Sequence, residues 1–472
     1  MTRSPQPSFS RPFSFLSCAF LALASIANGQ TKLAPELRSD IDNIAQQVLT
    51  KTGVPSASVA VVKNGEVVYL HAYGSARLEP RLPARPEMRY SVGSISKQFT
   101  ATAILMLAEE GKLSLDDPVA RFLPDLTRAK EVTIRQLLSH TSGYQDYWPQ
   151  DYVPPFMLQP ITAEKILDLW AKKPLDFDPG TKWQYSNTNY VIAGVIAEKA
   201  SGTPLLEFLQ TRIFAPLKME SVANIDQNKL GDGDPTGYMR YALGPLHPAP
   251  KEGRGWLFAA GELAMATSDL AKWDIGMMNE ALLKPASYKE MQTEVRLKNG
   301  EGTKYGLGLD VTMQGGHRVL EHTGEVSGFT SDNIVYPDDK IAVAVLTNQD
   351  AATAATQIGR KIAPLLLGQG ANSIAELKQV RAIFDGLQHG TIDRNLFTAD
   401  ANAYFSAQAL KDFASSLGSL GVPEEFTQTN EEGRGGMIMR TYALKFRQRT
   451  LDIWIYQMPD GKYEQYQVMP RE

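Results

Sequence analysis

The stretch Tyr90-Ser91-Val92-Gly93-Ser94-Ile95-Ser96-Lys97-Gln98-Phe99 decides how the rest of this chain is organised. It contains the pattern S-x-x-K, in which Ser94 stands one helical turn before Lys97. Apolar residues recur after it at helical spacing as far as Leu107, and Gly111 is typical of a helix end. Ser94 is therefore expected at a helix N-terminus, where unpaired backbone N–H groups and the positive end of the helix dipole lie.

This placement suits a nucleophile whose attack creates an oxyanion. The helix dipole and partial burial both disfavour an ammonium group, so Lys97 is pushed toward its neutral form. A neutral lysine can accept the proton of Ser94, whereas a charged one cannot. Taken alone, the four-residue pattern also fits two polar residues on a helix face, and its meaning depends on the rest of the chain.

Length and composition are those of an ordinary globular protein. The 472 residues allow two or three domains and a sizeable core, with 43% hydrophobic and 21% charged residues. The net charge of −4 gives no indication of binding to nucleic acid or to an anionic membrane surface.

The first 29 residues are predicted to be a signal peptide. Arg3 and Arg11 precede an apolar run over 13–26, and small residues follow it. An uncleaved anchor is the alternative; cleavage would leave a secreted or periplasmic protein with no membrane association. Because the single cysteine, Cys18, lies in this run, the mature chain would have no disulfide, thiolate metal site or catalytic thiol.

The remaining pattern predicts an α+β fold. A helix over 33–49 is followed by strands over 56–63 and 66–73, and Asn64-Gly65 between them is a strong hairpin signal. Several helices come next, then a second group of strands over 305–346 and a helix over 353–367. This order indicates an antiparallel sheet built from both ends of the domain, with a helical cluster inserted. The segment 225–255, rich in Gly, Pro and Asp, is expected to line or cover a cleft.

Two further polar segments invite a catalytic interpretation. The adjacent pair Ser139-His140 lacks the strand-turn-helix context of a serine–histidine hydrolase, so His140 is predicted to be structural, at a helix end. Tyr185-Ser186-Asn187 is expected on a loop before a helix over 191–201, where catalytic side chains are often held. Packing of an aromatic residue beside a helix start is the alternative there.

Three motifs taken together resemble the serine β-lactamase-like superfamily. They are Ser94-x-x-Lys97, Tyr185-x-Asn187 and His322-Thr323-Gly324, in that order. The branch of class C β-lactamases, D-Ala-D-Ala carboxypeptidases, D-aminopeptidases and esterases is the most similar, over about 33–367. The resemblance implies the β-lactamase/transpeptidase-like fold for the α+β domain.

The resemblance also implies roles for these residues. Ser94 would be acylated, while Lys97 and Tyr185 would share the proton transfers, with the lysine charge lowering the pKa of Tyr185. Asn187 would bind the substrate amide and Lys97. The backbone N–H groups of Ser94 and Glu325 would form the oxyanion hole. His322, Thr323, Gly324 and Glu325 would line the substrate-binding strand, with His322 toward the leaving group.

Two residues depart from the lactamase pattern. His322 stands where most β-lactamases of this branch have lysine, and histidine is mostly neutral at pH 7. Glu325 replaces a small residue and adds negative charge. Both weaken the case for carboxylate-bearing substrates.

The last hundred residues are predicted to form a separate module. Helices over 377–387 and 404–417, and strands over 437–446, 451–458 and 463–469, indicate an α+β accessory module, vaguely similar to the NTF2-like fold. The domains are thus predicted as 1–29 signal peptide, 30–368 serine hydrolase and 372–472 accessory module.

The combined prediction is a secreted serine hydrolase that acts through an acyl-enzyme on D-amino-acid peptides or small esters. A non-enzymatic penicillin-binding-like sensor and a true β-lactamase are the alternatives. A small-molecule or peptide substrate is expected, with no cofactor, catalytic metal or nucleic acid. The oligomeric state stays open.

Overall fold

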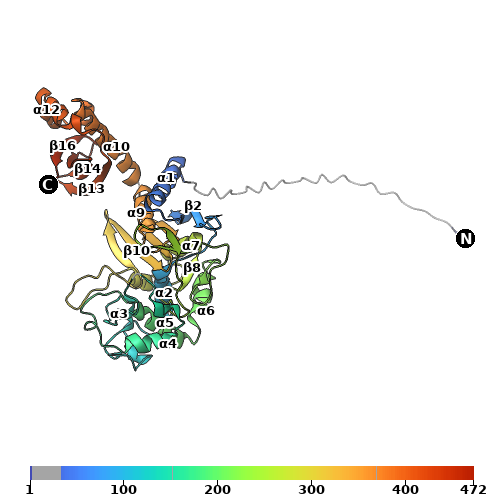
Figure 1. Cartoon of the computed structure of the whole chain (residues 1–472). Helices are drawn as coiled ribbons and strands as arrows, with labels where there is room; N and C mark the ends of the chain where they lie inside the picture. The colour runs from blue at the N-terminus through green and yellow to red at the C-terminus, as the bar shows by residue number, and fades with distance from the viewer. Residues whose placement is uncertain (3–32, 151, 368, 472) are drawn as a thin grey trace.

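A computed structural model describes residues 1–2, 33–150, 152–367 and 369–471 of the chain. The expected signal peptide lies outside the described residues, apart from residues 1–2. The described chain forms a larger N-terminal part and a smaller C-terminal part beyond α9, joined at α10 (Figure 1).

A seven-stranded antiparallel sheet is the centre of the larger part, with the strand order β3-β2-β1-β12-β11-β10-β9. The expected hairpin is present, since Asn64 (φ 55°) and Gly65 (φ 75°) take the left-handed conformations that a two-residue type I′ turn requires. The strands are β1 (Ser56–Lys63), β2 (Glu66–Arg77), β3 (Leu82–Pro83), β9 (Asp310–Gln314), β10 (His317–Val326), β11 (Phe329–Tyr336) and β12 (Ile341–Thr347).

The N-terminal and C-terminal strands of the sheet are joined at its centre, because β1 pairs with β12 from Ala57↔Thr347 to Lys63↔Ile341. This confirms the expected antiparallel sheet built from both ends of the domain. Alternate residues of β1 enter different cores: Val59 and Val61 face one side, Ala60 and Val62 the other. Burial of both faces explains why β1 and β12 read as continuous apolar runs.

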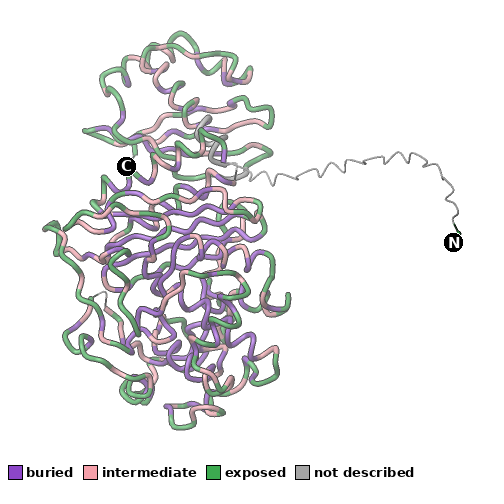
Figure 2. Tube along the Cα trace, turned by 90° about the vertical axis from the view of Figure 1, so that its right-hand side faces the viewer, coloured by how far each residue is buried: buried purple, intermediate pink, exposed green. Residues whose placement is uncertain are grey.

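Helices cover both faces. Helices α1 (Pro35–Thr52) and α9 (Ala354–Leu366) pack together on one face, with Ile41 and Ile358 in the same core as Val61. The other face is covered by α7 (Thr267–Met278), and the short turn that contains Ser94 and leads into α2 (Ser96–Glu109) packs against β10 and β11. Figure 2 shows that buried residues are concentrated in this sandwich and in the helical cluster below it.

The inserted cluster contains the remaining helical elements and short strands of the larger part. They are η1 (Gly93–Ile95), η2 (Val119–Arg121), α3 (Ile134–Leu138), η3 (Pro155–Leu158), α4 (Ala163–Ile166), η4 (Leu167–Ala171), α5 (Asn187–Ser201), α6 (Leu205–Leu209), η5 (Gln210–Phe214), α8 (Pro285–Met291), β4 (Tyr90–Ser91), β5 (Ala223–Asn224), β6 (Tyr238–Arg240), β7 (Leu246–Pro248) and β8 (Leu263–Met265). Their apolar side chains share one core with the face of the sheet to which Ala60 and Val62 point.

The C-terminal part has its own core and a four-stranded antiparallel sheet. Its elements are α10 (Gln369–Gln388), η6 (Arg394–Leu396), α11 (Ala399–Tyr404), α12 (Ala407–Leu417), η7 (Gly418–Leu420), β13 (Glu425–Arg434), β14 (Met437–Lys445), β15 (Thr450–Gln457) and β16 (Tyr463–Pro470). The expected α+β module is therefore present.

Two details of this module differ from the sequence expectation. The helix expected over 404–417 is α12 and begins only at Ala407, because the chain turns at Phe405 and Ser406 caps α12 by accepting a hydrogen bond from Ala409 N; the short helix α11 before it was not expected. Strand β13 was not expected, since its sequence is largely polar. It is an edge strand that pairs only with β14, through a turn at Gly435-Gly436.

Candidate active site

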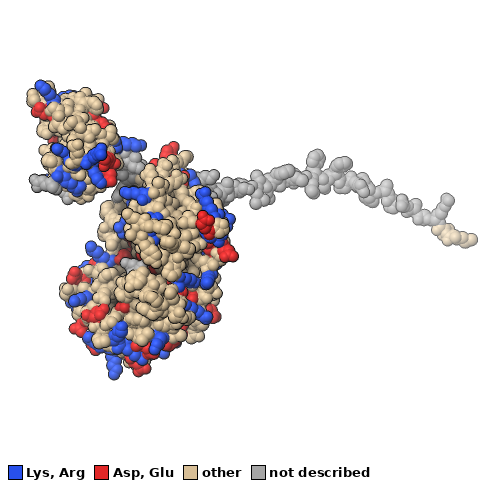
Figure 3. All heavy atoms as spheres, in the orientation of Figure 1, with Lys and Arg blue, Asp and Glu red and all other residues tan. Residues whose placement is uncertain are grey.

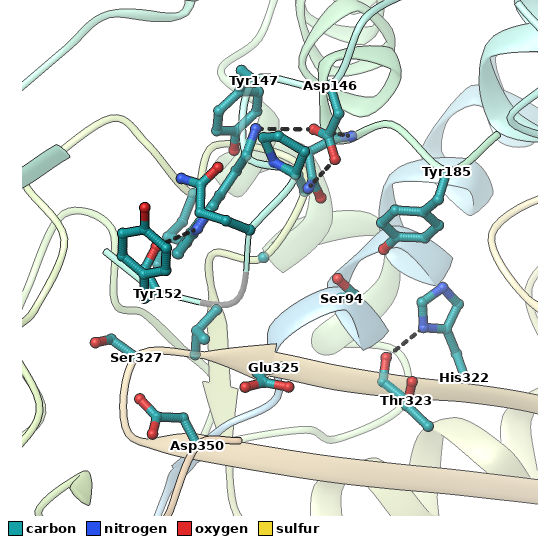
Figure 4. A pocket seen from close by; sticks show the side chains of 18 of the residues that line it. Ser94, Asp146, Tyr147, Tyr152, Tyr185, His322, Thr323, Glu325, Ser327 and Asp350 are labelled. Atoms are coloured by element: carbon teal, nitrogen blue, oxygen red, sulfur yellow. Dashed lines mark hydrogen bonds between the residues drawn. The ribbon is translucent and has the colours of Figure 1, made fainter. Parts of the chain in front are cut away.

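Ser94 lies in η1, which runs directly into α2, so the serine stands at the start of a continuous helical segment as expected. It is partly exposed and lines a cavity of about 620 Å³ (Figure 4). The cavity lies between the helical cluster and β10, and both sides contribute polar groups.

Lys97 is fully buried behind the serine. Its Nζ is 2.9 Å from Ser94 Oγ, 2.8 Å from Asn187 Oδ1 and 2.8 Å from Ala260 O. Burial lowers the pKa of Lys97 to about 7, and the nearby Asp146 carboxylate opposes that shift. A neutral amine here can donate to Asn187 and Ala260 and use its lone pair to accept the Ser94 proton. Both protonation states are therefore accessible near neutral pH.

Asn187 is held from the other side by Asp146, which the sequence analysis missed. The Asp146 carboxylate accepts hydrogen bonds from Asn187 N (2.9 Å), Trp148 N (3.1 Å) and Asn187 Nδ2 (3.3 Å). These contacts fix the amide, so that its oxygen points at Lys97. Asp146 lies in an irregular segment after α3, and no periodicity or motif marked it. The helix expected from residue 191 begins at Asn187, so this residue occupies its first turn.

Tyr185 lies beside Ser94 with its hydroxyl directed toward the serine (Figure 4). Burial raises the pKa of the phenol and the Ser94 hydroxyl opposes that shift, but within the described residues the Tyr185 hydroxyl makes no well-aligned hydrogen bond. The carboxylates of Asp146 and Asp310 also raise the pKa of Tyr185. The expectation that the pKa of Tyr185 is lowered is therefore wrong, because burial of the phenol outweighs every effect that would lower it. Tyr185 remains a phenol at neutral pH.

His140 supports the Tyr185 loop. It follows α3 with φ 58°, and its Nδ1 accepts a hydrogen bond from Ser186 N at 3.2 Å. Its ring lies 4.3 Å from the Tyr185 ring, centroid to centroid. His140 is thus a buried structural residue, as expected, but it acts on this loop and not on the carbonyls that end a helix. Ser139 is buried and its hydroxyl contacts Thr141.

The third motif lies on β10, where the strand is an edge. Residues 317–321 of β10 pair with β9, whereas 322–326 have only β11 beside them. His322 Nδ1 donates to Thr323 O at 2.6 Å, and Nε2 accepts from the Tyr305 hydroxyl at 2.9 Å. Burial, and then the Lys97 charge, lower the pKa of His322 to about 4. His322 is therefore a neutral imidazole in the physiological range.

Two glycines let β10 approach the nucleophile. A Cβ on Gly93, which has φ +52°, would lie 2.6 Å from Glu325 N. A Cβ on Gly324 would lie 2.0 Å from Val92 O. The backbone N–H groups of Ser94 and Glu325 are thereby brought to the same corner of the cavity. Paired N–H donors in this arrangement can stabilise the oxyanion of a tetrahedral intermediate.

The rest of the cavity is aromatic and acidic. Residues 146–150 and 152–153, and not the expected segment 225–255, line the side opposite β10. The segment 225–255 instead packs against the β10–β11 turn, where Glu252 accepts a hydrogen bond from Ser327 N at 2.9 Å. The ring-bearing residues of the lining are Tyr147, Trp148, Tyr152, Trp183, Tyr185, Tyr305 and His322, and the carboxylates are Asp146, Asp310, Glu325 and Asp350.

Among the described residues, no group of three or more His, Cys, Asp or Glu side chains is arranged so that it could hold a metal ion. Among the same residues, no helix combines the length and apolar character needed to cross a membrane.

A family model and two curated proteins match the N-terminal part of the chain. The sequence model of the family described as Beta-lactamase matches residues 41–365. Penicillin-binding protein 4* of Bacillus subtilis (strain 168) is 30% identical over 331 residues, 66% of this chain and 73% of that protein. A D-aminopeptidase of Brucella anthropi is 28% identical over 334 residues, 70% of this chain and 62% of its own length.

Among solved structures, a D-stereospecific amidohydrolase from Streptomyces sp. is similar with a TM-score of 0.59 and 30% identity. The match covers 67% of this chain and 96% of the amidohydrolase.

Proposed function

The chain belongs to the beta-lactamase family of serine hydrolases, and from that premise we propose that it cleaves amide, peptide or ester bonds of D-amino-acid substrates through an acyl-enzyme at Ser94. The observation that carries the proposal is the set of contacts that Lys97 makes with Ser94 and Asn187 beside an accessible cavity. The D-amino-acid preference is taken from the activities named for the similar aminopeptidase and amidohydrolase.

The proposed reaction begins with proton transfer. Neutral Lys97 takes the proton of Ser94 while Oγ forms a bond to the substrate carbonyl carbon. The resulting oxyanion lies between the N–H groups of Ser94 and Glu325. Each such donor typically contributes about 3 kcal/mol to transition-state stabilisation.

The leaving group departs with a proton. Tyr185, kept as a phenol by burial, donates it, and the Lys97 ammonium returns a proton to Tyr185. The carbon–nitrogen or carbon–oxygen bond breaks and Ser94 is left acylated. Water then attacks the acyl-enzyme; its proton passes to the Lys97–Tyr185 pair, and the departing Ser94 oxygen is protonated again.

The cavity argues against efficient β-lactam hydrolysis. A β-lactam carries a carboxylate, and neither lysine nor arginine is among the described residues that line the cavity. His322 is neutral near pH 7 because its pKa is lowered to about 4. The non-enzymatic sensor remains the second candidate, since acylation without turnover would use the same residues.

The test is labelling followed by turnover. A fluorophosphonate probe should label the purified protein, and Ser94→Ala should abolish both labelling and hydrolysis of D-phenylalanine p-nitroanilide. Ser139→Ala is the matched control and should retain both. Labelling without turnover of amides, esters or cephalosporins would favour the sensor. Loss of labelling in Ser139→Ala but not in Ser94→Ala would refute the assignment of the nucleophile.

Secretion and domain boundaries are also part of the proposal. The predicted signal peptide over 1–29 supports export, and separate apolar cores support boundaries at 30–368 and 372–472. N-terminal sequencing of the protein recovered outside the cytoplasm should begin near residue 30; an intact N-terminus would refute cleavage.

A further inference from the structure

One buried carboxyl lies two residues after the carbonyl that binds Lys97, and the proposed reaction does not use it. Glu262 is 2% exposed, whereas the acidic side chains visible in Figure 3 lie at the surface, with cationic ones interspersed among them. Burial, and then the charge of Asp226, raise the pKa of Glu262 to about 8. A carboxyl buried in this way costs stability unless hydrogen bonds compensate, so the hydrogen bonds of Glu262 indicate its role.

Both oxygens of Glu262 accept hydrogen bonds from groups that are held in place. Its Oε1 accepts from Ala259 N at 3.2 Å, and its Oε2 accepts from Asn224 Nδ2 at 2.7 Å. The amide of Asn224 is fixed in this orientation, because its Oδ1 accepts from Asp226 N at 2.9 Å and from Gln227 N at 3.1 Å. The carboxyl of Glu262 therefore joins the end of β5 to the turn that precedes β8.

That turn contains a residue in an unfavourable backbone conformation. Ala259 has φ 58°, a left-handed value that residues other than glycine rarely adopt. It is packed between the two helices that carry the lysine and the asparagine of the active site: its carbonyl accepts from Thr100 Oγ1 of α2 at 2.8 Å, and a Cβ on Gly194 of α5 would lie 2.4 Å from the Ala259 Cβ. Such a conformation persists only where its surroundings hold it, and the hydrogen bond to Glu262 is one of the contacts that do so.

The carbonyl that follows Ala259 is the one that binds the catalytic lysine. Ala260 O accepts from Lys97 Nζ at 2.8 Å. Because the backbone angles of Ala259 set the direction of the next residue, a contact that fixes Ala259 also directs the Ala260 carbonyl. Glu262 is not among the residues that line the cavity. Asp146 is the carboxylate whose charge shifts the pKa of Lys97, so an effect of Glu262 on the lysine acts through the backbone between them.

We infer that Glu262 is a positioning residue for the acylation proposed at Ser94. Its carboxyl fixes the turn at Ala259, which holds the Ala260 carbonyl against Nζ of the catalytic lysine. The amine is thereby kept in the orientation in which it reaches the Ser94 hydroxyl. This inference rests on the proposed acyl-enzyme and adds a residue that touches neither the substrate nor the transferred proton. In either protonation state the carboxyl keeps an acceptor oxygen for Ala259 N.

The first variant is Glu262→Met, which keeps the length of the side chain and removes both acceptor oxygens. If the Ala260 carbonyl moves away from Nζ, the ammonium form loses an acceptor and the pKa of Lys97 should fall. The midpoint of the pH profile for inactivation by an uncharged fluorophosphonate should move down by about half a pH unit. The kcat for D-phenylalanine p-nitroanilide, counted per labelled serine, should fall about tenfold, while KM should change less than about threefold, because Glu262 does not contact the substrate.

A double substitution tests the hydrogen bonds themselves. Glu262→Gln combined with Asn224→Asp exchanges the carboxyl and the amide. The glutamine oxygen at 262 accepts from Ala259 N, its NH₂ group donates to the carboxylate at 224, and that carboxylate still accepts from the two backbone N–H groups that Asn224 binds. The double variant should keep the wild-type midpoint and kcat. Asp274→Asn is the control, because Asp274 is also a fully buried carboxyl with a pKa raised to about 8 and is not among the residues that line the cavity; it should keep both values.

The outcomes separate the positioning role from the proposed function. A wild-type midpoint and kcat in Glu262→Met would overturn the positioning role and leave the proposed function intact. An equal loss in the double variant would also overturn it, because the restored hydrogen bonds would then have no effect. If Glu262→Met does not fold, Glu262→Gln alone takes its place, since one acceptor oxygen then faces two donors and the same changes are expected at smaller size.

A second measurement does not depend on activity. If the wild type reacts with no fluorophosphonate or substrate, the proposed function fails, and the midpoint is read instead from the ¹³Cε resonance of Lys97 in protein labelled with ¹³C-lysine. The resonance is assigned by its absence from Lys97→Met. A downward shift of this midpoint in Glu262→Met that the double variant lacks would support the positioning of the lysine by Glu262; equal midpoints in all three proteins would refute it.

Discussion

The buried Lys97 makes the pH dependence of acylation a direct test of the site. Its pKa is lowered to about 7 by burial, and the neutral amine is the form that accepts the Ser94 proton. Acylation should therefore increase as pH rises through 7. At pH 6 only about one eleventh of the lysine is neutral, and at pH 8 about ten elevenths, so the rate should rise about tenfold between them.

Replacing Asp146 by asparagine should shift this profile. The Asp146 carboxylate favours the ammonium form and so raises the pKa of Lys97; its removal should lower that pKa. Hydrogen bonds of 2.8 and 3.3 Å through Asn187 join the two groups. Two unit charges about 8 Å apart, at an effective dielectric constant of about 20, interact by about 2 kcal/mol.

The expected shift is smaller than this Coulomb value. Burial raises the pKa of Asp146, so it carries less than a full charge at low pH. We expect the midpoint to fall by about one pH unit, equivalent to about 1.4 kcal/mol. The neutral fraction at pH 6 would then rise about fivefold, with little change at pH 8.

The assay is the second-order rate of inactivation by an uncharged fluorophosphonate from pH 5.5 to 8.5, with each profile normalised to its own plateau. Normalisation separates the pKa shift from any loss of rate caused by the weaker hold on Asn187. Asp178→Asn is the control, because it removes an exposed carboxylate outside the cavity. A midpoint in Asp146→Asn that is unchanged or higher would refute the electrostatic reasoning.

Three other predictions concern the scaffold. Gly324→Ala should lower kcat by about 10²–10³-fold, as expected for a displaced oxyanion donor, because its Cβ would lie 2.0 Å from Val92 O; Gly233→Ala, where a Cβ meets nothing within 4 Å, should be near wild type in the same assay. Asp274 is buried with its pKa raised to about 8, so its contribution to stability is full below the unfolded pKa of about 4 and is lost as pH rises to 8. Asp274→Asn should therefore raise the urea midpoint more at pH 8 than at pH 4, and a pH-independent difference would contradict this. Truncation after Leu367 should leave a folded protein that still labels at Ser94, since the cavity lining ends at Asp350; a folded truncation that fails to label would show that the tail completes the site.

The sheet could be predicted from the sequence because the patterns that specify its strands and its first turn are local. Asn64-Gly65 and the apolar runs of β1 and β12 specify a turn and two strands buried on both faces. It could not predict β13, since a polar edge strand has no alternating pattern, nor Asp146, whose role depends on a contact with Asn187 across 41 positions. The expected lowering of the Tyr185 pKa was wrong for a related reason. Burial raises this pKa, and burial depends on the folded cavity and not on neighbouring residues in the sequence.

The pairing of β1 with β12 has a consequence for biosynthesis. Ser56 in β1 and Asn348 after β12 are hydrogen-bonded although they are 292 positions apart. During translation β1 and β2 emerge early and have no partner on the β1 side until almost the whole catalytic region has been made. Pairing at such sequence separation is slow, and an unpaired apolar strand is prone to aggregation in the interval. The same delay keeps Glu325 away from Ser94, so the nucleophile and its oxyanion donor are brought together late, once the catalytic region is nearly complete.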